Sequence, residues 1–193
     1  MRKKDYIVQL NYKDEKFCYV MKACQHISRE QALSLITAGR LKSYQMQGLV
    51  RKVHYINKGK QCNAYELTAK GRDWIKHHYP DMGKNFYLSS CAVHHNIALA
   101  NQVIQREQQR DWLTERDLRQ ELLDHIDRAS PEERFRLLGR LERGEISIPD
   151  GGYREGGELY CVEIINENYG QAQIQAKTEY AEVMGADLSF VRQ

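Results

Sequence analysis

The chain has 193 residues, of which 41% are hydrophobic and 28% charged, the composition of an ordinary globular protein with one medium or two small domains. No apolar run approaches the roughly 18 residues that cross a bilayer, and the start of the chain leads into no apolar segment. We therefore expect a cytoplasmic protein with neither a membrane span nor a secretory signal.

The spacing of cysteine and histidine argues against a metal site. The chain contains no C-x-x-C pair, so we expect reduced thiols. Its two adjacent histidine pairs, at 77–78 and 94–95, would point about 100° apart on a helix, which is poor geometry for chelation. We expect no resident cofactor.

The net charge of +3 hides a division along the chain. Residues 1–80 carry 16 Lys and Arg against 6 Asp and Glu, and residues 81–193 carry 13 against 20. No acid occurs from residue 31 to 65. Charge separated in this way is typical of a phosphate-binding module joined to a neutral or acidic one. We expect two domains, 1–82 and 83–193.

The first half of the chain begins with three expected helices. The first covers residues 15–23. Ser28 is a good N-cap, and Gln31 three positions later completes a capping box that opens the second helix. That helix ends at 38–39, and a third helix covers 40–47.

Two strands and a closing helix are expected next. Residues 50–56 are rich in β-branched and aromatic side chains, and residues 63–67 return as a partner strand across a turn at 57–60. Thr68 caps a helix that runs to His78. Three helices followed by a two-stranded hairpin is the order of a winged helix-turn-helix.

Two phrases, Gly-Leu-Val-Arg at 48–51 and Tyr-Glu-Leu-Thr at 65–68, resemble those of the winged helix-turn-helix superfamily. The resemblance implies that the third helix enters the major groove and the hairpin tip reaches phosphates. The predicted DNA contacts are Arg40, Lys42, Ser43, Tyr44, Gln45, Gln47, Arg51, Lys52, Lys58 and Lys60. Packing is the alternative role for Tyr44, and Met46 is assigned to packing. The alternative for the whole face is protein contact.

The second half alternates helices with strands. A helix with a periodic apolar stripe starts near residue 90, an extended stretch covers 111–113, and Thr114 and Ser130 cap two further helices. The expected elements after these are a Pro-Asp strand at 146–150, a loop at 151–157, a strand at 159–165, a helix at 170–184 and a short strand at 189–191.

This order resembles the restriction-endonuclease-like core, whose mark is PD…(D/E)xK. Two carboxylates at adjacent strand ends hold Mg²⁺ there, and a lysine two positions after the second acid faces the same site. Asp150 and Glu163 match the carboxylates, but Ile165 occupies the lysine position, and Lys177 on the next helix is the candidate replacement. Mg²⁺ on the carboxylate pair is expected only if the site is active. Two further polar candidates are Glu115 and His94.

The whole order resembles the replication-relaxation family of mobile-element proteins. The motifs that carry the resemblance are Trp-x-Thr-Glu-Arg-x-Leu-Arg at 112–119, the Pro-Asp and Val-Glu-Ile segments, and Ala-Lys-x-x-Tyr at 176–180. The matching residues are His94 or His95, Glu115, Asp150, Glu163, Lys177 and Tyr180. The resemblance implies DNA binding near an origin or transfer locus of a plasmid or integrative element, in conjugation, mobilisation or replication.

An α+β fold is therefore expected, with a winged helix-turn-helix followed by a PD-(D/E)xK-like domain. The first interpretation is an accessory protein that binds double-stranded DNA and contacts a relaxase or other mobilisation protein, with an inactive nuclease-like domain. The second is a Mg²⁺-dependent nickase, a deoxyribonuclease. The third is a transcriptional regulator that acts as a homodimer on a palindromic site.

Overall fold

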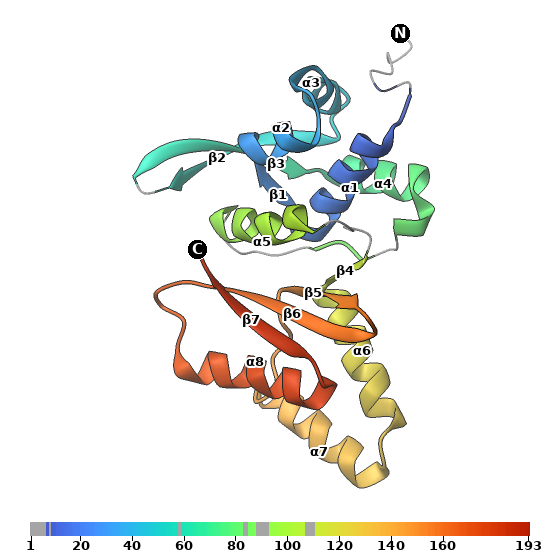
Figure 1. The fold of residues 1–193 in the computed structure, drawn as a ribbon, viewed down its shortest axis with the longest axis vertical. Helices are drawn as coiled ribbons and strands as arrows, with labels where there is room; N and C mark the ends of the chain where they lie inside the picture. The colour runs from blue at the N-terminus through green and yellow to red at the C-terminus, as the bar shows by residue number, and fades with distance from the viewer. Residues whose placement is uncertain (1–6, 8, 58, 83–84, 88–92, 107–110) are drawn as a thin grey trace. The chain divides into compact units, whose positions relative to one another are not determined.

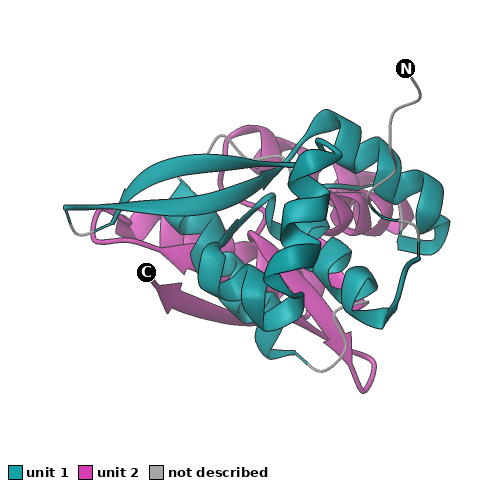
Figure 2. Cartoon of the chain, turned by 90° about the horizontal axis from the view of Figure 1, so that it is seen from above, with its two compact units in different colours: residues 1–110 teal, residues 111–193 magenta. Residues whose placement is uncertain are grey.

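The structure is a computed structural model of residues 1–193, and it describes all of them except 1–6, 8, 58, 83–84, 88–92 and 107–110. The described residues form a mixed α+β fold of two compact units, residues 1–110 and 111–193 (Figure 1, Figure 2). Among the helices of the described residues, none has both the length and the apolar character that crossing a membrane requires.

Unit 1 arranges its helices around a three-stranded antiparallel sheet with the strand order β1-β3-β2. A long hairpin, β2–β3, projects from this unit (Figure 1), with Val50 opposite Leu67 at its base and Asn57 opposite Lys60 near its tip. The elements of unit 1 are α1 (Tyr12–Cys24), β1 (His26–Ser28), α2 (Arg29–Leu35), α3 (Ala38–Met46), β2 (Val50–Asn57), β3 (Lys60–Leu67), α4 (Ala69–His78), a 3-10 turn (Pro80–Met82) and α5 (Val93–Gln105).

Local capping signals start two of these helices where the sequence predicts. The Ser28 hydroxyl accepts the Gln31 N–H at 3.1 Å, and the Gln31 side chain accepts the Ser28 N–H at 2.8 Å. The Thr68 hydroxyl accepts the Gly71 N–H at 2.9 Å. Both predicted caps are confirmed. Gly71 also lets α4 pack on the backbone, because a Cβ there would lie 2.1 Å from the Leu49 carbonyl oxygen.

Two features of unit 1 depend on contacts between distant parts of the sequence. The strand β1 is only three residues long and exists because it pairs with β3. The helix α5 packs on α1 and β1, and the Gln31 amide donates to the Ile97 carbonyl at 2.8 Å and to Asn101 at 2.6 Å. The first compact unit therefore extends to residue 110, past the boundary expected at 82.

Unit 2 is a four-stranded mixed sheet with helices packed on one face (Figure 1). Its strand order is β4-β5-β6-β7, with β5 antiparallel to β6 and β7 parallel to β6. The elements are β4 (Trp112–Thr114), α6 (Glu115–Arg128), α7 (Pro131–Glu142), β5 (Gly151–Glu155), β6 (Glu158–Ile165), α8 (Gln171–Met184) and β7 (Asp187–Arg192). The core between helices and sheet includes Leu118, Leu122, Ile126, Leu137, Leu159 and Tyr180.

The expected strand ending in Pro-Asp is wrong. The segment before Asp150 is irregular, and β5 begins at Gly151, inside the expected loop. A Cβ on Gly151 would lie 2.6 Å from the Trp112 ring, and one on Gly152 would lie 2.5 Å from the Tyr160 carbonyl oxygen. These glycines therefore permit close packing within the sheet. Their neighbours are distant in the sequence, so the local pattern indicated a loop instead.

Candidate functional site

The helix α3 exposes one side to solvent. Lys42 and Met46 are exposed and four residues apart, and Ala38 and Gly39 are exposed at its start. The predicted contacts that are half-buried on this helix and its C-cap are Ser43, Gln45 and Gln47. The assignment of Met46 to packing is wrong, because 57% of its surface is exposed. The outward side of α3 is therefore formed by two small residues, a lysine and a methionine.

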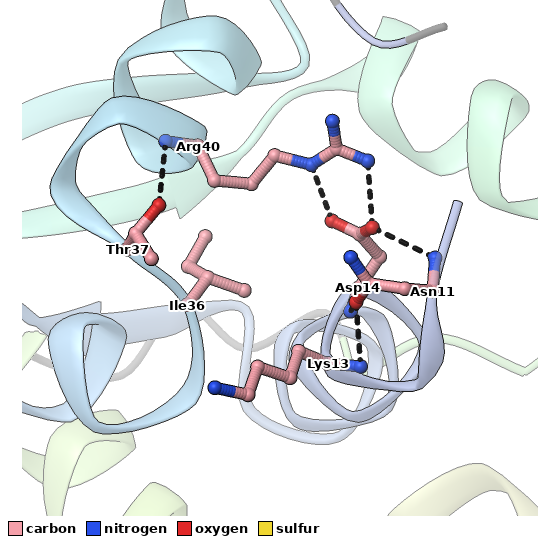
Figure 3. A pocket seen from close by; sticks show the side chains of 6 residues that line it. All are labelled: Asn11, Lys13, Asp14, Ile36, Thr37 and Arg40. Atoms are coloured by element: carbon pink, nitrogen blue, oxygen red, sulfur yellow. Dashed lines mark hydrogen bonds and ion pairs between the residues drawn. The ribbon is translucent and has the colours of Figure 1, made fainter. Parts of the chain in front are cut away.

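Arg40 and Tyr44, both predicted DNA contacts, face the protein interior instead. Asp14 of α1 is fully buried, and Arg40 donates to its carboxylate through Nε at 2.7 Å and Nη2 at 2.6 Å (Figure 3). The Tyr44 hydroxyl donates to the same carboxylate at 3.1 Å, and the Tyr44 ring lies 4.8 Å from Phe17. A buried carboxylate requires such donors because its desolvation is costly. These two side chains hold α3 against α1.

A small pocket of about 130 Å³ lies beside this ion pair (Figure 3). It is lined by Asn11, Lys13, Asp14, Ile36, Thr37 and Arg40. The Asp14 carboxylate already accepts hydrogen bonds from Arg40, from Tyr44 and from the Asn11 N–H at 3.0 Å. The pocket therefore lies at the α1–α3 contact, and its acid is committed to the fold rather than to a ligand.

The hairpin carries the other predicted contacts. Arg51 donates to Glu66 of the paired strand at 2.5 Å, and this hydrogen bond raises the pKa of Arg51. Lys52 and Lys60 are exposed on β2 and β3. Lys58, the remaining predicted contact at the tip, lies outside the described residues. Arg51 is thus engaged within the hairpin. Lys52 and Lys60 lie on opposite faces of the hairpin, because Lys60 is paired with Asn57, which is five residues from Lys52 along β2.

Three lysine ammonium groups of α3 and the hairpin form no ion pair or hydrogen bond with any described residue: Lys42, Lys52 and Lys60. The acid-free run from 31 to 65 leaves them without a local carboxylate, and Glu66 is bound to Arg51. Unit 1 as a whole holds 19 Lys and Arg against 8 Asp and Glu. Exposed, uncompensated ammonium groups are the kind that a phosphate backbone neutralises.

Unit 2 brings three predicted catalytic residues into contact. Asp150 precedes β5, Glu163 lies in β6 and Lys177 lies in α8. The Glu163 Oε2 accepts the Asp150 N–H at 3.0 Å, and the Asp150 Oδ2 accepts the Ile164 N–H at 2.8 Å. The Lys177 Nζ lies 3.0 Å from Glu163 Oε2 and donates to the Ile148 carbonyl at 2.6 Å. The helix lysine therefore reaches back to the carboxylate pair.

This cluster is closed. Glu163 is 3% exposed, and its second oxygen accepts the Tyr169 hydroxyl at 2.5 Å. Burial and the nearby Asp150 raise the pKa of Glu163, while Lys177 and Tyr169 act in the opposite direction. Both Glu163 oxygens serve protein donors, so in this arrangement the residues do not fit Mg²⁺ coordination. Tyr169 could not be predicted from the sequence, because a tyrosine in a loop before a helix gives no motif signal.

The remaining candidate residues form other contacts or belong to the other unit. Glu115 begins α6 and its carboxylate lies 3.7 Å from Arg119. His94 is exposed on α5, in unit 1, whereas the carboxylate pair belongs to unit 2. Tyr180 is fully buried and donates to the Leu118 carbonyl at 3.0 Å. Within the described residues, no group of three or more His, Cys, Asp or Glu side chains could hold a metal ion.

Comparisons of the chain with protein families, with curated proteins and with solved structures find no match. The resemblance to the replication-relaxation family therefore stays a prediction from the residues of the chain.

Replacing Arg40 by Met should destabilise the protein by about 3 kcal/mol, because it leaves the buried Asp14 carboxylate without its main partner. Urea unfolding followed by tryptophan fluorescence measures this loss. Lys42→Met is the control, since Lys42 is exposed and unpaired among the described residues, and it should leave stability nearly unchanged. Equal stability of the two variants would contradict the structural role of Arg40.

Replacing Lys177 by Met should cost about 3 kcal/mol at pH 7, because Glu163 and Asp150 then lack a compensating cation. The Glu163 pKa, already raised in the folded state, would rise further. A raised folded-state pKa lowers stability as pH rises above the ordinary value of 4.5, so the deficit should shrink toward pH 4.5. Unfolding curves from pH 4.5 to 8 test this, and a deficit independent of pH would refute it. Arg119→Met, in an exposed pair, is the control.

Proposed function

We propose that this protein is a DNA-binding accessory protein of a plasmid or integrative element, which acts in conjugative mobilisation or replication initiation. Unit 1 would be a winged helix-turn-helix, with α2 and α3 as the helix pair and β2–β3 as the wing (Figure 1). The element order of α1, β1, α2, α3 and an antiparallel hairpin supports this fold assignment.

The observation that carries the proposal is the set of uncompensated charges on the recognition helix and the wing. Lys42 is exposed on α3, and Lys52 and Lys60 are exposed on the hairpin. A folded protein tends to pair its surface charges or to mix their signs, but residues 31–65 contain no acid. A DNA duplex supplies the missing anions along its phosphate backbone. A helix followed by a hairpin fits such a duplex, because the helix can enter the major groove while the hairpin contacts the flanking phosphates.

Unit 2 would be a restriction-endonuclease-like domain whose site is inactive. Asp150, Glu163 and Lys177 meet as in a PD-(D/E)xK site, but the lysine and Tyr169 close the pair. Residues 111–193 carry 10 Lys and Arg against 18 Asp and Glu, which argues against an extended DNA footprint there. A relaxase or another mobilisation protein is the partner that we propose for this unit.

Neutralising the three exposed lysines of α3 and the hairpin in one variant, Lys42→Gln/Lys52→Gln/Lys60→Gln, should weaken duplex binding and flatten its salt dependence. If each ammonium contacts one phosphate, the slope of log K against log[salt] should fall by about 3 units. Fluorescence anisotropy with a labelled duplex from 50 to 200 mM salt measures both quantities.

The matched control removes three positive charges elsewhere, at Lys16, Lys76 and Arg119, all of which are exposed. It should keep the wild-type slope. Equal slopes for the two triple variants would mean that binding follows net charge alone and would overturn the proposed face.

A Mg²⁺-dependent nickase is the second candidate, because Asp150, Glu163 and Lys177 gather in one place. We expect no nicking of supercoiled plasmid with Mg²⁺, since the carboxylates are committed to protein donors. Nicked circles that disappear with EDTA and in Asp150→Asn would establish the nuclease instead. Glu115→Gln, on a carboxylate paired with Arg119, is the control for loss of one acidic charge.

A further inference from the structure

A glycine in the first turn of α3 has no explanation within the described fold. Gly39 is not among the residues with a positive φ, so its backbone conformation suits any amino acid. A Cβ placed there would meet no atom of another described part of the chain within 4 Å. Glycine lowers helix stability relative to alanine, so folding alone favours a different residue here.

At other positions of the chain, close packing inside the protein explains why the residue is glycine. A Cβ on Gly71 would clash with the Leu49 carbonyl oxygen, and Cβ atoms on Gly151 and Gly152 would clash with neighbouring strands. At these positions a second segment of the protein approaches the backbone. Gly39 has the same lack of a side chain, but its space opens to solvent. Gly139 on α7 also lacks a packed neighbour, apart from the flexible Arg143 side chain, so the open space at Gly39 shows only that a partner has room to approach this backbone closely.

The other end of the same helix face carries an unusual apolar side chain. Met46 lies four residues after Lys42 and eight after Ala38, so the three residues share one side of α3. Met46 exposes 57% of its surface. The face thus combines a free ammonium with an exposed thioether chain, and residues 31–65 contain no acid to repel a polyanion.

We infer that α3 meets duplex DNA at closest approach through Gly39, and that Met46 reads the methyl group of a thymine in the major groove. The inference rests on the proposed DNA-binding function and specifies it. Thymine alone among the four bases presents a methyl group in that groove, and apolar side chains recognise it by contact. Lys42, between the two residues on the same face, supplies the charge complementarity that selects DNA as the occupant.

The first test uses Gly39→Ala in the full chain, with a duplex selected by the wild-type protein from a random pool. The added methyl group should raise the melting temperature by about 2 °C through helix propensity. It should weaken duplex binding about tenfold, because it occupies the space that the DNA needs. The salt slope should not change, since no charge is altered. Gly139→Ala on α7 is the control, where a Cβ would meet only the flexible Arg143 side chain.

The second test replaces each thymine of the selected duplex by deoxyuridine, which removes only the methyl group. One or two replacements should weaken wild-type binding about fourfold, the effect of one buried methyl group. The Met46→Ala variant should bind the thymine and uracil duplexes equally. If no thymine-to-deoxyuridine replacement weakens binding, or if the loss persists in Met46→Ala, the proposed contact between Met46 and a thymine methyl group would be overturned.

The results separate this inference from the proposed function. A wild-type chain that selects no duplex would overturn both. Loss of binding in the triple-lysine variant, together with wild-type affinity in Gly39→Ala, would overturn only the close approach at Gly39. Opposite effects of Gly39→Ala on stability and affinity would support it, because a purely structural glycine would change both in the same direction.

Discussion

The buried carboxylate of Asp14 is the interaction on which unit 1 depends. It accepts a hydrogen bond from the Asn11 N–H at the start of α1 and, at the same time, hydrogen bonds from the side chains of Arg40 and Tyr44 on α3. Rotation of α3 about its axis would break the hydrogen bonds from Arg40 and Tyr44 and leave the buried carboxylate with only the Asn11 N–H. The rotation of the helix is therefore fixed, and Lys42 and Met46 point outward as a consequence.

Unit 2 also contains a buried carboxylate that is held by several protein partners. Glu163 accepts hydrogen bonds from the Asp150 N–H and the Tyr169 hydroxyl and pairs with Lys177. Both of its oxygens therefore contact protein donors, although the residues resemble a nuclease site. Five arginines of unit 2 form ion pairs: Arg134–Asp127, Arg136–Glu133, Arg140–Glu179, Arg143–Glu145 and Arg154–Glu121. Lys42, Lys52 and Lys60 have no such partner among the described residues, and residues 31–65 contain no acid, which is why we divide the proposed roles between the units.

The sequence predicted those features that a few neighbouring residues determine. The caps at Ser28 and Thr68 and the β-branched and aromatic residues of the hairpin were sufficient, because capping and strand propensity are local. Features set by distant contacts were not predictable. In the sequence Arg40 looks like a basic residue of a recognition helix, and only its pairing with Asp14, 26 positions earlier, shows its structural role. For the same reason, the sequence around Gly151 and Gly152 predicted a loop where the structure has β5. Asp150, Glu163 and Lys177 were found through a motif, whereas Tyr169 has none.

The most direct test of the central claim is hydrogen exchange of the full chain, measured by mass spectrometry with and without a saturating selected duplex. We predict slower exchange in peptides covering residues 38–47 and 50–67, because DNA would cover the recognition helix and the wing. Peptides from 111–193 should change little. Protection confined to residues 111–193, with α3 and the hairpin unaffected, would contradict the account and transfer DNA binding to the second unit.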